Sequence, residues 1–184
     1  MEKVTVKELL KLDITNKVIC FPTDTVYGVG AKVSDVNAVR RIYEMKRRSN
    51  DKPLAILTGT KDVEKYVKNV TSDARKLMDE GWPGALTLIF EKSDDIADEI
   101  TQGFKTIAFR MPDSKVALEI LNHFGLMATT SVNFSGQKEL SNVLDIEETF
   151  SDWIDYIVTD EEVFSSKPSK IIDVTKDEIK IIRN

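Results

Sequence analysis

Short apolar runs alternate with longer amphipathic stretches along most of this chain. Runs of about 4–8 residues that are rich in β-branched and aromatic side chains and bounded by turn residues are typical of buried strands. The pattern predicts strands over residues 17–21, 53–59, 85–92, 106–112, 126–130, 154–159, 169–175 and 178–183. The last two strands are expected to form a hairpin, because only a short "KDE" segment separates them.

Apolar positions at helical spacing predict helices between these strands. Ser34 is expected to cap a helix whose inner face carries Val36, Val39 and Ile42. Further helices are expected over residues 4–12, 62–67, 72–80, 113–124 and 146–153. Because neither a repeat nor a linker interrupts the series, we expect one domain over residues 1–184, of α/β or α+β class with a mixed sheet.

The composition is that of a globular protein, since 41% of the 184 residues are hydrophobic and 31% are charged. No apolar run approaches the roughly 18 residues of a membrane span, and the first residues lack the apolar core of a secretory signal. A single cysteine rules out an internal disulfide, and with a single histidine it argues against a zinc site. We therefore expect a cytoplasmic protein without a membrane partner.

The net charge of −5 hides two segments of opposite sign. Residues 145–166 carry eight acidic side chains and neither lysine nor arginine. Residues 40–52 carry six basic side chains against two acidic ones. A charged run is usually a solvated helix face, but the basic segment is also suited to an anionic ligand.

The stretch "CFPTDTVYGVG", residues 20–30, raises the question of a ligand site. An apolar strand ends at Pro22, three polar side chains follow, and Tyr27 then precedes two glycines. A polar turn at the end of an apolar strand often lies at the rim of a sheet, where ligands bind. The alternative is an ordinary turn between a strand and a helix.

Familiar catalytic and nucleotide-binding signatures are missing from the sequence. It contains no phosphate-binding loop of the G-x-x-x-x-G-K-[ST] type, no dinucleotide fingerprint and no cluster of metal ligands. His123 is interpreted as a surface or capping residue, and Cys20 as a core residue. The polar residues that remain are mostly Lys, Arg, Ser, Thr and Asn at the ends of strands. They favour adenylyl or phosphoryl transfer, in which positioning and charge neutralisation supply most of the catalysis.

Six motifs occur in a characteristic order: "FPTDTVYGVG", "YEMKRRSNDKPL", "WPGALTLIF", "AFRMP", "TTSVNFSG", and "PSKIID" with a following "IIR". Together they resemble the YrdC-like family of threonylcarbamoyl-AMP synthases, of the TsaC type, from about residue 10 to Arg183. The chain stops at Asn184, so it is similar to the short single-domain form of the family. The resemblance implies a twisted open mixed sheet flanked by helices, with a large positively lined cavity.

The resemblance also implies a reaction. L-threonine, bicarbonate or CO2, and ATP would give threonylcarbamoyl-adenylate and pyrophosphate, with Mg2+ carried on the ATP phosphates. Partner proteins, the threonylcarbamoyl transferase complex, would then use this intermediate to modify tRNA beside the anticodon. The chemistry suits the residues, because crowded anions must be held together by fixed cations.

Individual roles follow from matching the chain to the motifs of the family. Lys46 and Arg48 match its K-x-R motif and are expected to be catalytic by holding phosphates, a task for which the planar guanidinium of Arg48 is well suited. Ser131 and Asn133 match an S-x-N motif. The expected ATP-binding residues are Lys46, Arg48, Lys52, Thr106, Asn133, Ser141 and Arg183, and the expected threonine-binding residues are Thr25, Arg110, Ser131 and Ser169.

The chain departs from the family pattern at three positions. Leu57 stands where many relatives have histidine, so one polar contact to threonine is expected to be missing. Lys170 replaces the threonine of a frequent Ser-Thr pair, and the segment before Ser141 lacks the usual proline.

Two other functions stay open at this point. The same fold is associated with binding double-stranded RNA or tRNA, so a non-catalytic RNA-binding or ribosome-maturation protein is the alternative, with residues 40–52 on RNA phosphates. A carbamoyl-transfer domain of the hydrogenase-maturation type is the second, against which the missing acylphosphatase and zinc-finger-like segments argue. For Thr25, Ser131 and Asn133, the structural alternative is turn capping.

Overall fold

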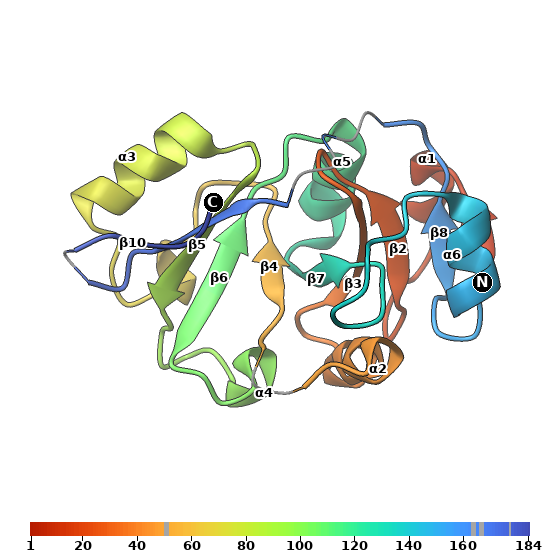
Figure 1. Ribbon diagram of the computed structural model, residues 1–184, viewed down its shortest axis with the longest axis horizontal. Coiled ribbons are helices and arrows are strands. Elements are labelled where there is room, and N and C mark those ends of the chain that lie inside the picture. The colour runs from red at the N-terminus through yellow and green to blue at the C-terminus, as the bar shows by residue number, and fades with distance from the viewer. Residues whose placement is uncertain (50–51, 163–164, 166–167, 177) are drawn as a thin grey trace.

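The computed structural model describes residues 1–49, 52–162, 165, 168–176 and 178–184. In these residues ten strands form one sheet in the order β1-β8-β2-β3-β7-β4-β6-β5-β9-β10 (Figure 1). Strands β1, β8 and β2 run parallel, as do the pairs β4–β6 and β5–β9, and the other neighbours run antiparallel, so the expected mixed sheet is confirmed. The strands are β1 (Glu2–Val4), β2 (Ile19–Pro22), β3 (Tyr27–Lys32), β4 (Ala55–Leu57), β5 (Leu86–Glu91), β6 (Thr106–Arg110), β7 (Met127–Ser131), β8 (Tyr156–Val158), β9 (Lys170–Asp173) and β10 (Lys180–Arg183).

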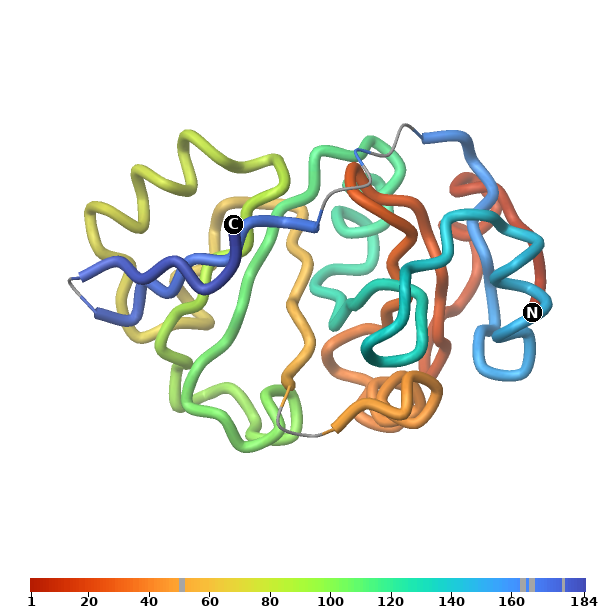
Figure 2. Tube along the Cα trace, in the orientation of Figure 1, coloured from red at the N-terminus to blue at the C-terminus, as the bar shows by residue number. Residues whose placement is uncertain are grey.

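The two ends of the chain lie in opposite halves of the molecule (Figure 2), because β1 and β10 form opposite edges of the sheet. The expected terminal hairpin is confirmed, since β9 and β10 pair antiparallel. Among the described residues, no helix has the length and apolar character that crossing a bilayer requires.

Helices cover both faces of the sheet. Successive side chains of a strand point to opposite faces, so an apolar strand needs cover on both. In β2, Cys20 packs in one buried cluster and Ile19 and Phe21 pack in another. The first cluster contains residues of α2 (Val36–Lys46), α3 (Ser72–Gly81) and α6 (Val143–Phe150), and the second contains residues of α1 (Val6–Leu9) and α5 (Lys115–Phe124). The fully apolar sequence of β2 thus reflects burial on both faces.

Side-chain caps explain where several helices begin. Thr5 accepts the amide of Glu8 at the start of α1, and Ser114 accepts the amide of Ala117 at the start of α5. The prediction that Ser34 caps α2 is wrong. The N-cap is Asp35, which makes no side-chain cap bond because its carboxylate accepts the amide of Asn16 instead.

Other differences from the predicted elements are local. The helix expected over residues 62–67 is a single 3-10 turn, η1 (Glu64–Tyr66). The helix expected over residues 146–153 is α6, which begins at Val143 because Asn142 accepts the amide of Leu144. Three elements have no counterpart in the prediction, namely β1, β3 and α4 (Asp98–Thr101).

The stretch 20–30 is a hairpin, so the alternative of a turn between a strand and a helix is wrong. β2 and β3 pair from Ile19 opposite Gly30 to Pro22 opposite Tyr27. The glycines allow β7 to approach on the other side of β3, since a Cβ at Gly30 would lie 2.7 Å from Thr129 Oγ1. The polar residues 23–25 form the tip of this hairpin.

Replacing Gly30 by alanine should destabilise the protein by about 1–3 kcal/mol, because the added methyl overpacks a buried strand pair. Chemical denaturation of the variant measures this free energy. Gly103→Ala is not a suitable control, since Gly103 has a φ of +80° that disfavours a side chain. Ala97→Gly, at the N-cap of the short helix α4, offers a milder comparison. A Gly30→Ala protein as stable as the wild type would contradict the close packing of β3 on β7.

Candidate functional site

A cavity of about 510 Å³ lies on the same face of the sheet as α5, next to the part that α5 covers. Leu57 marks the boundary, because it packs in the cluster with α5 and also lines the cavity. Ala108, Ile89 and Ile171 continue the apolar wall over β6, β5 and β9. This volume is within the range of about 300–1,000 Å³ typical of small-molecule sites.

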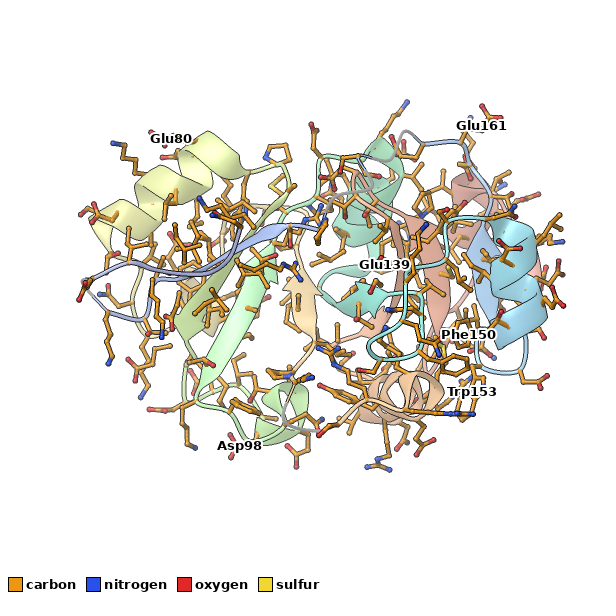
Figure 3. All side chains as sticks on the ribbon, in the orientation of Figure 1. Glu80, Asp98, Glu139, Phe150, Trp153 and Glu161 are labelled. Atoms are coloured by element: carbon orange, nitrogen blue, oxygen red, sulfur yellow. The ribbon has the colours of Figure 1, made fainter. Side chains whose placement is uncertain are left out.

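Positive charge dominates the lining of this cavity. Among the described residues, four cations line it, Arg48, Lys52, Arg110 and Arg183, against one carboxylate, Glu139. Glu139 comes from the loop after β7, near the centre of Figure 3. The charged groups in the described part of the lining are thus mainly cationic.

Arg110, at the end of β6, is fixed by three partners. Its Nη2 donates to Asp24 Oδ1 at 2.6 Å, its Nη1 to Thr25 Oγ1 at 3.0 Å, and its Nε to the carbonyl of Gly84 at 3.1 Å. The side chains of Arg110 and Asp24 are only 10% and 15% exposed. Burial lowers the pKa of Arg110, and the nearby charge of Arg183 lowers it further, whereas Asp24 raises it. A fixed guanidinium at the cavity wall is suited to a carboxylate ligand.

The hairpin tip shapes the other side of this contact. The Thr23 hydroxyl donates to the carbonyl of Val26 at 2.7 Å, which closes the tip. Thr23 Oγ1 and Thr25 Oγ1 lie 3.1 Å apart, and because the Thr23 proton is already donated, Thr25 is the donor in this pair. Thr25 and Arg110 therefore line the cavity as one connected unit.

Lys46, the last residue of α2, is only 1% exposed and does not line the cavity. Its Nζ donates to the carbonyls of Ser131 and Asn133 at 2.5 and 3.0 Å and to Asn133 Oδ1 at 2.5 Å. Burial, followed by the charge of Arg48, lowers the pKa of Lys46 to about 8, and Glu139 opposes the shift. The structure thus joins the two motifs K-x-R and S-x-N in one hydrogen-bonded unit.

Ser131 lines the cavity, whereas Asn133 is buried behind it. The Ser131 hydroxyl donates to Asn133 Oδ1 at 2.9 Å, and Asn133 Nδ2 donates to the carbonyl of Gln137 at 2.6 Å. Among the described residues, every buried side-chain nitrogen and oxygen has a hydrogen-bond partner. Such a satisfied network holds its groups in one arrangement.

A second connected unit stands at the β9–β10 end of the cavity. Arg183 donates through Nε and Nη2 to the Ser169 carbonyl at 2.9 and 2.8 Å, and through Nη2 to Ser169 Oγ at 3.2 Å. Ser169 Oγ also lies 2.9 Å from Thr87 Oγ1. All three residues line the cavity, so the hairpin between β9 and β10 places one predicted ATP residue beside one predicted threonine residue.

Arg48 and Lys52 reach the cavity from the segment between α2 and β4. Arg48 Nε donates to the carbonyl of Lys52 at 2.7 Å, which ties the two residues together. Arg48 also lines a second cavity of about 490 Å³, together with Arg40, Arg47 and Glu99.

Besides Lys46 and Asn133, two further predicted site residues, Thr106 and Ser141, do not line the cavity. Thr106 begins β6, opposite Glu91 of β5, and Ala108 and Arg110 further along the same strand line the cavity instead. Ser141 lines a different cavity, of about 610 Å³, with Tyr27 and Glu162. Lys170 lies on β9 and is not among the lining residues, whereas Leu57 is, so the apolar departure falls in the cavity wall.

The structure adds residues that the motifs did not assign to ligand contacts. Asp24 fixes Arg110, Thr87 contacts Ser169, and Glu139 supplies the carboxylate of the lining. Asp24 has a sequence signal, since it stands between two predicted polar turn residues, but its partner is 86 residues away. Thr87 lies within the motif "WPGALTLIF", which is assigned no ligand contact, and Glu139 lies outside the six motifs.

The described residues contain no group of three or more His, Cys, Asp or Glu that could hold a metal ion. Among the lining residues in the described part of the chain, Glu139 offers a carboxylate to a cation. Mg2+ commonly binds through one or two carboxylates together with substrate phosphates and water. The donor set therefore fits a Mg2+ ion that arrives on a nucleotide.

Comparison with known proteins gives a consistent result. The Sua5/YciO/YrdC family model, described as "Telomere recombination", matches residues 14–184. A threonylcarbamoyl-AMP synthase of Pyrococcus abyssi is 36% identical over 87% of this chain and 48% of its own length, and one of Bacillus subtilis is 42% identical over 66% and 36%. The solved structure of P. abyssi Sua5 complexed with L-threonine superposes with a TM-score of 0.90 at 32% identity, over 99% of this chain and 56% of that one. The chain thus spans about half or less of the length of these relatives.

Proposed function

Because the chain belongs to the Sua5/YciO/YrdC family, we propose that it is an L-threonylcarbamoyladenylate synthase, a nucleotidyltransferase. Its substrates are L-threonine, bicarbonate or CO2, and ATP, and its products are threonylcarbamoyl-AMP and pyrophosphate. One observation carries the proposal most directly. One cavity is lined by four described cations, of which Arg110 is fixed to Thr25, and this suits several anions held side by side.

The reaction proceeds in two steps that this cavity can support. The threonine amine attacks CO2, forming an N–C bond and releasing a proton, which gives a carbamate. A carbamate oxygen then attacks the α-phosphorus of ATP, and the bond from that phosphorus to the bridging oxygen of pyrophosphate breaks. Both steps need the reactants held close and their negative charge neutralised, and neither needs a covalent nucleophile from the protein.

The lining residues divide between the two substrates. We assign the ATP phosphates to Arg48 and Lys52 from the segment between α2 and β4, and to Arg183 from β10. The assignment of the threonine carboxylate to Arg110 rests on its fixed and buried guanidinium. Thr25, Ser131 and Ser169 provide hydroxyl groups around the amino acid.

Magnesium is expected to enter on the ATP phosphates, where it shields their charge and favours the departure of pyrophosphate. Glu139 is the lining residue suited to orient it. A threonylcarbamoyl-adenylate is a reactive mixed anhydride, so we expect a partner transferase complex to consume it and pass the threonylcarbamoyl group to tRNA.

The proposal is tested by measuring pyrophosphate released from ATP in the presence of Mg2+ and bicarbonate. We expect release to depend on L-threonine and to require no RNA. Folded protein that releases no pyrophosphate but binds tRNA, with an affinity that falls steeply as salt rises, would favour the RNA-binding alternative.

Amino-acid specificity gives a further prediction. Valine lacks the hydroxyl of threonine and leaves buried polar groups unpaired, so it should be rejected by about 10⁴-fold in kcat/KM. Serine keeps the hydroxyl and loses one methyl, a difference of about 1–3 kcal/mol, so it should be the better of the two wrong substrates. Pyrophosphate release with each amino acid measures both ratios, and equal rates with valine and threonine would contradict the roles given to Thr25, Ser131 and Ser169.

A further inference from the structure

The ammonium group of Lys46 is fully engaged inside the protein. It has three N–H donors, and three oxygens lie within 3.0 Å of it, the carbonyls of Ser131 and Asn133 and the side-chain oxygen of Asn133. None of these donors is left for a phosphate, and Lys46 does not line the cavity. Its position therefore suits a residue that acts through the Ser131–Asn133 segment.

The contacts of Asn133 determine which end of its amide is oxygen. An ammonium can only donate, so the atom 2.5 Å from Lys46 Nζ is the oxygen. A backbone carbonyl can only accept, so the atom 2.6 Å from the Gln137 carbonyl is the nitrogen. Two independent partners thus require the same amide orientation.

This orientation fixes the hydroxyl proton of Ser131. Asn133 Oδ1 has no proton to give, so the Ser131 hydroxyl is the donor across the 2.9 Å that separate them. Ser131 then faces the cavity with oxygen lone pairs only. Thr25, in the tip of the hairpin between β2 and β3, likewise has no proton to offer to the cavity, because its hydroxyl proton is donated to Thr23 Oγ1.

We propose that Lys46 is a positioning residue which, through Asn133, holds the Ser131 hydroxyl as a hydrogen-bond acceptor toward the substrate. The site then recognises a hydrogen-bond donor of the amino acid, either its α-ammonium or its side-chain hydroxyl. This assignment rests on the proposed function, since it takes threonine as the ligand. It replaces a phosphate contact for Lys46 and leaves the phosphates to Arg48, Lys52 and Arg183.

Binding measurements on the full chain without turnover test the proposal. Calorimetric titrations would compare L-threonine with 3-hydroxybutyrate, which lacks the ammonium, and with 2-amino-3-fluorobutyrate, which lacks the hydroxyl proton. In the wild type we expect at least one analogue to bind at least about tenfold more weakly than threonine. This ratio of analogue to threonine dissociation constants, the analogue penalty, should fall to about threefold or less in Ser131→Ala. The analogue whose penalty falls identifies the group of threonine that Ser131 contacts.

The decisive variant is Lys46→Met. The penalty that shrinks in Ser131→Ala should shrink in Lys46→Met as well, because the amide of Asn133 is no longer held and Ser131 can turn its proton into the cavity. The affinity for a non-hydrolysable ATP analogue should change by less than about threefold. Lys92→Met is the matched control, since Lys92 is another buried lysine, whose ammonium donates to the Ile96 carbonyl and to Asp98 outside this cavity. It should leave every ratio unchanged.

Three results would overturn the assignment. One is a tenfold or greater loss of ATP-analogue affinity in Lys46→Met with the analogue penalties intact, which would make Lys46 a phosphate ligand. Another is that Ser131→Ala leaves the affinity of both analogues relative to threonine unchanged. The third is that Asn133→Ala, used where Lys46→Met fails to fold, keeps the full penalty. A wild-type chain that binds no threonine at all would overturn the proposed function itself, so the two failures are distinguishable.

Discussion

Replacing Arg110 by glutamine is expected to weaken L-threonine binding by about a hundredfold, while affinity for a non-hydrolysable ATP analogue stays within a few-fold. Removing one partner of a buried, hydrogen-bonded charge pair costs roughly 2–5 kcal/mol, and a hundredfold lies at the lower end of that range. Arg110 is such a group, with three partners and a side chain only 10% exposed. Separate calorimetric titrations with threonine and with the ATP analogue measure the two effects.

Controls must separate lost recognition from lost structure. Arg110→Gln leaves Asp24 without its partner, so thermal unfolding of the variant should accompany the titrations. Arg75→Gln is a matched control, because Arg75 is an exposed arginine that pairs with Glu64 away from the cavity. If a folded Arg110→Gln protein bound threonine as tightly as the wild type, the carboxylate site would have to lie elsewhere.

The converse result is expected for Arg48→Lys. Lysine keeps the charge but loses the planar fork, and a charge-assisted hydrogen bond is worth about 1.5–3 kcal/mol, so affinity for the ATP analogue should fall about tenfold to a hundredfold. Threonine affinity in the absence of nucleotide should change little. The substrates lie close together, so a small cross-effect is expected.

Arg40→Lys provides the comparison for Arg48. Arg40 shares the second cavity with Arg48 but does not line the proposed site. An equal loss of ATP-analogue affinity in both variants would move the nucleotide to that second cavity. Unchanged affinity in Arg48→Lys, with the fold preserved, would show that its guanidinium does not hold the ATP phosphates.

Much of the fold could be predicted because apolar periodicity is a local signal. The strand over 85–92 and the helix over 113–124 appear as β5 and α5 with small changes at their ends. β3 was not predicted, because Gly28 and Gly30 alternate with Tyr27, Val29 and Ala31 in "YGVGAK", and glycine is disfavoured in strands. It is a strand because β2 and β7 flank it on both sides, which is a tertiary effect.

The candidate site shows the same division. Motif matching selected Thr25, Arg110, Ser131 and Ser169, and the fold brings all four to one cavity although they lie on separate elements. Sequence alone could not show that Lys46 is directed at Asn133, because that contact spans 87 residues and depends on how α2 ends. The same limit applies to Ser141, since the sequence could not show that it lines a different cavity, with Tyr27 and Glu162. Its predicted contact with ATP stays a prediction.

The central claim is that one cavity joins threonine, CO2 and ATP. The most direct test is mass spectrometry of the products formed from L-threonine, ¹³C-labelled bicarbonate, ATP and Mg2+ by the full chain. We predict a threonine-dependent adenylate that carries one labelled carbon, formed together with pyrophosphate and lost in Arg110→Gln. Folded protein that binds threonine and ATP yet yields no labelled adenylate would contradict the claim.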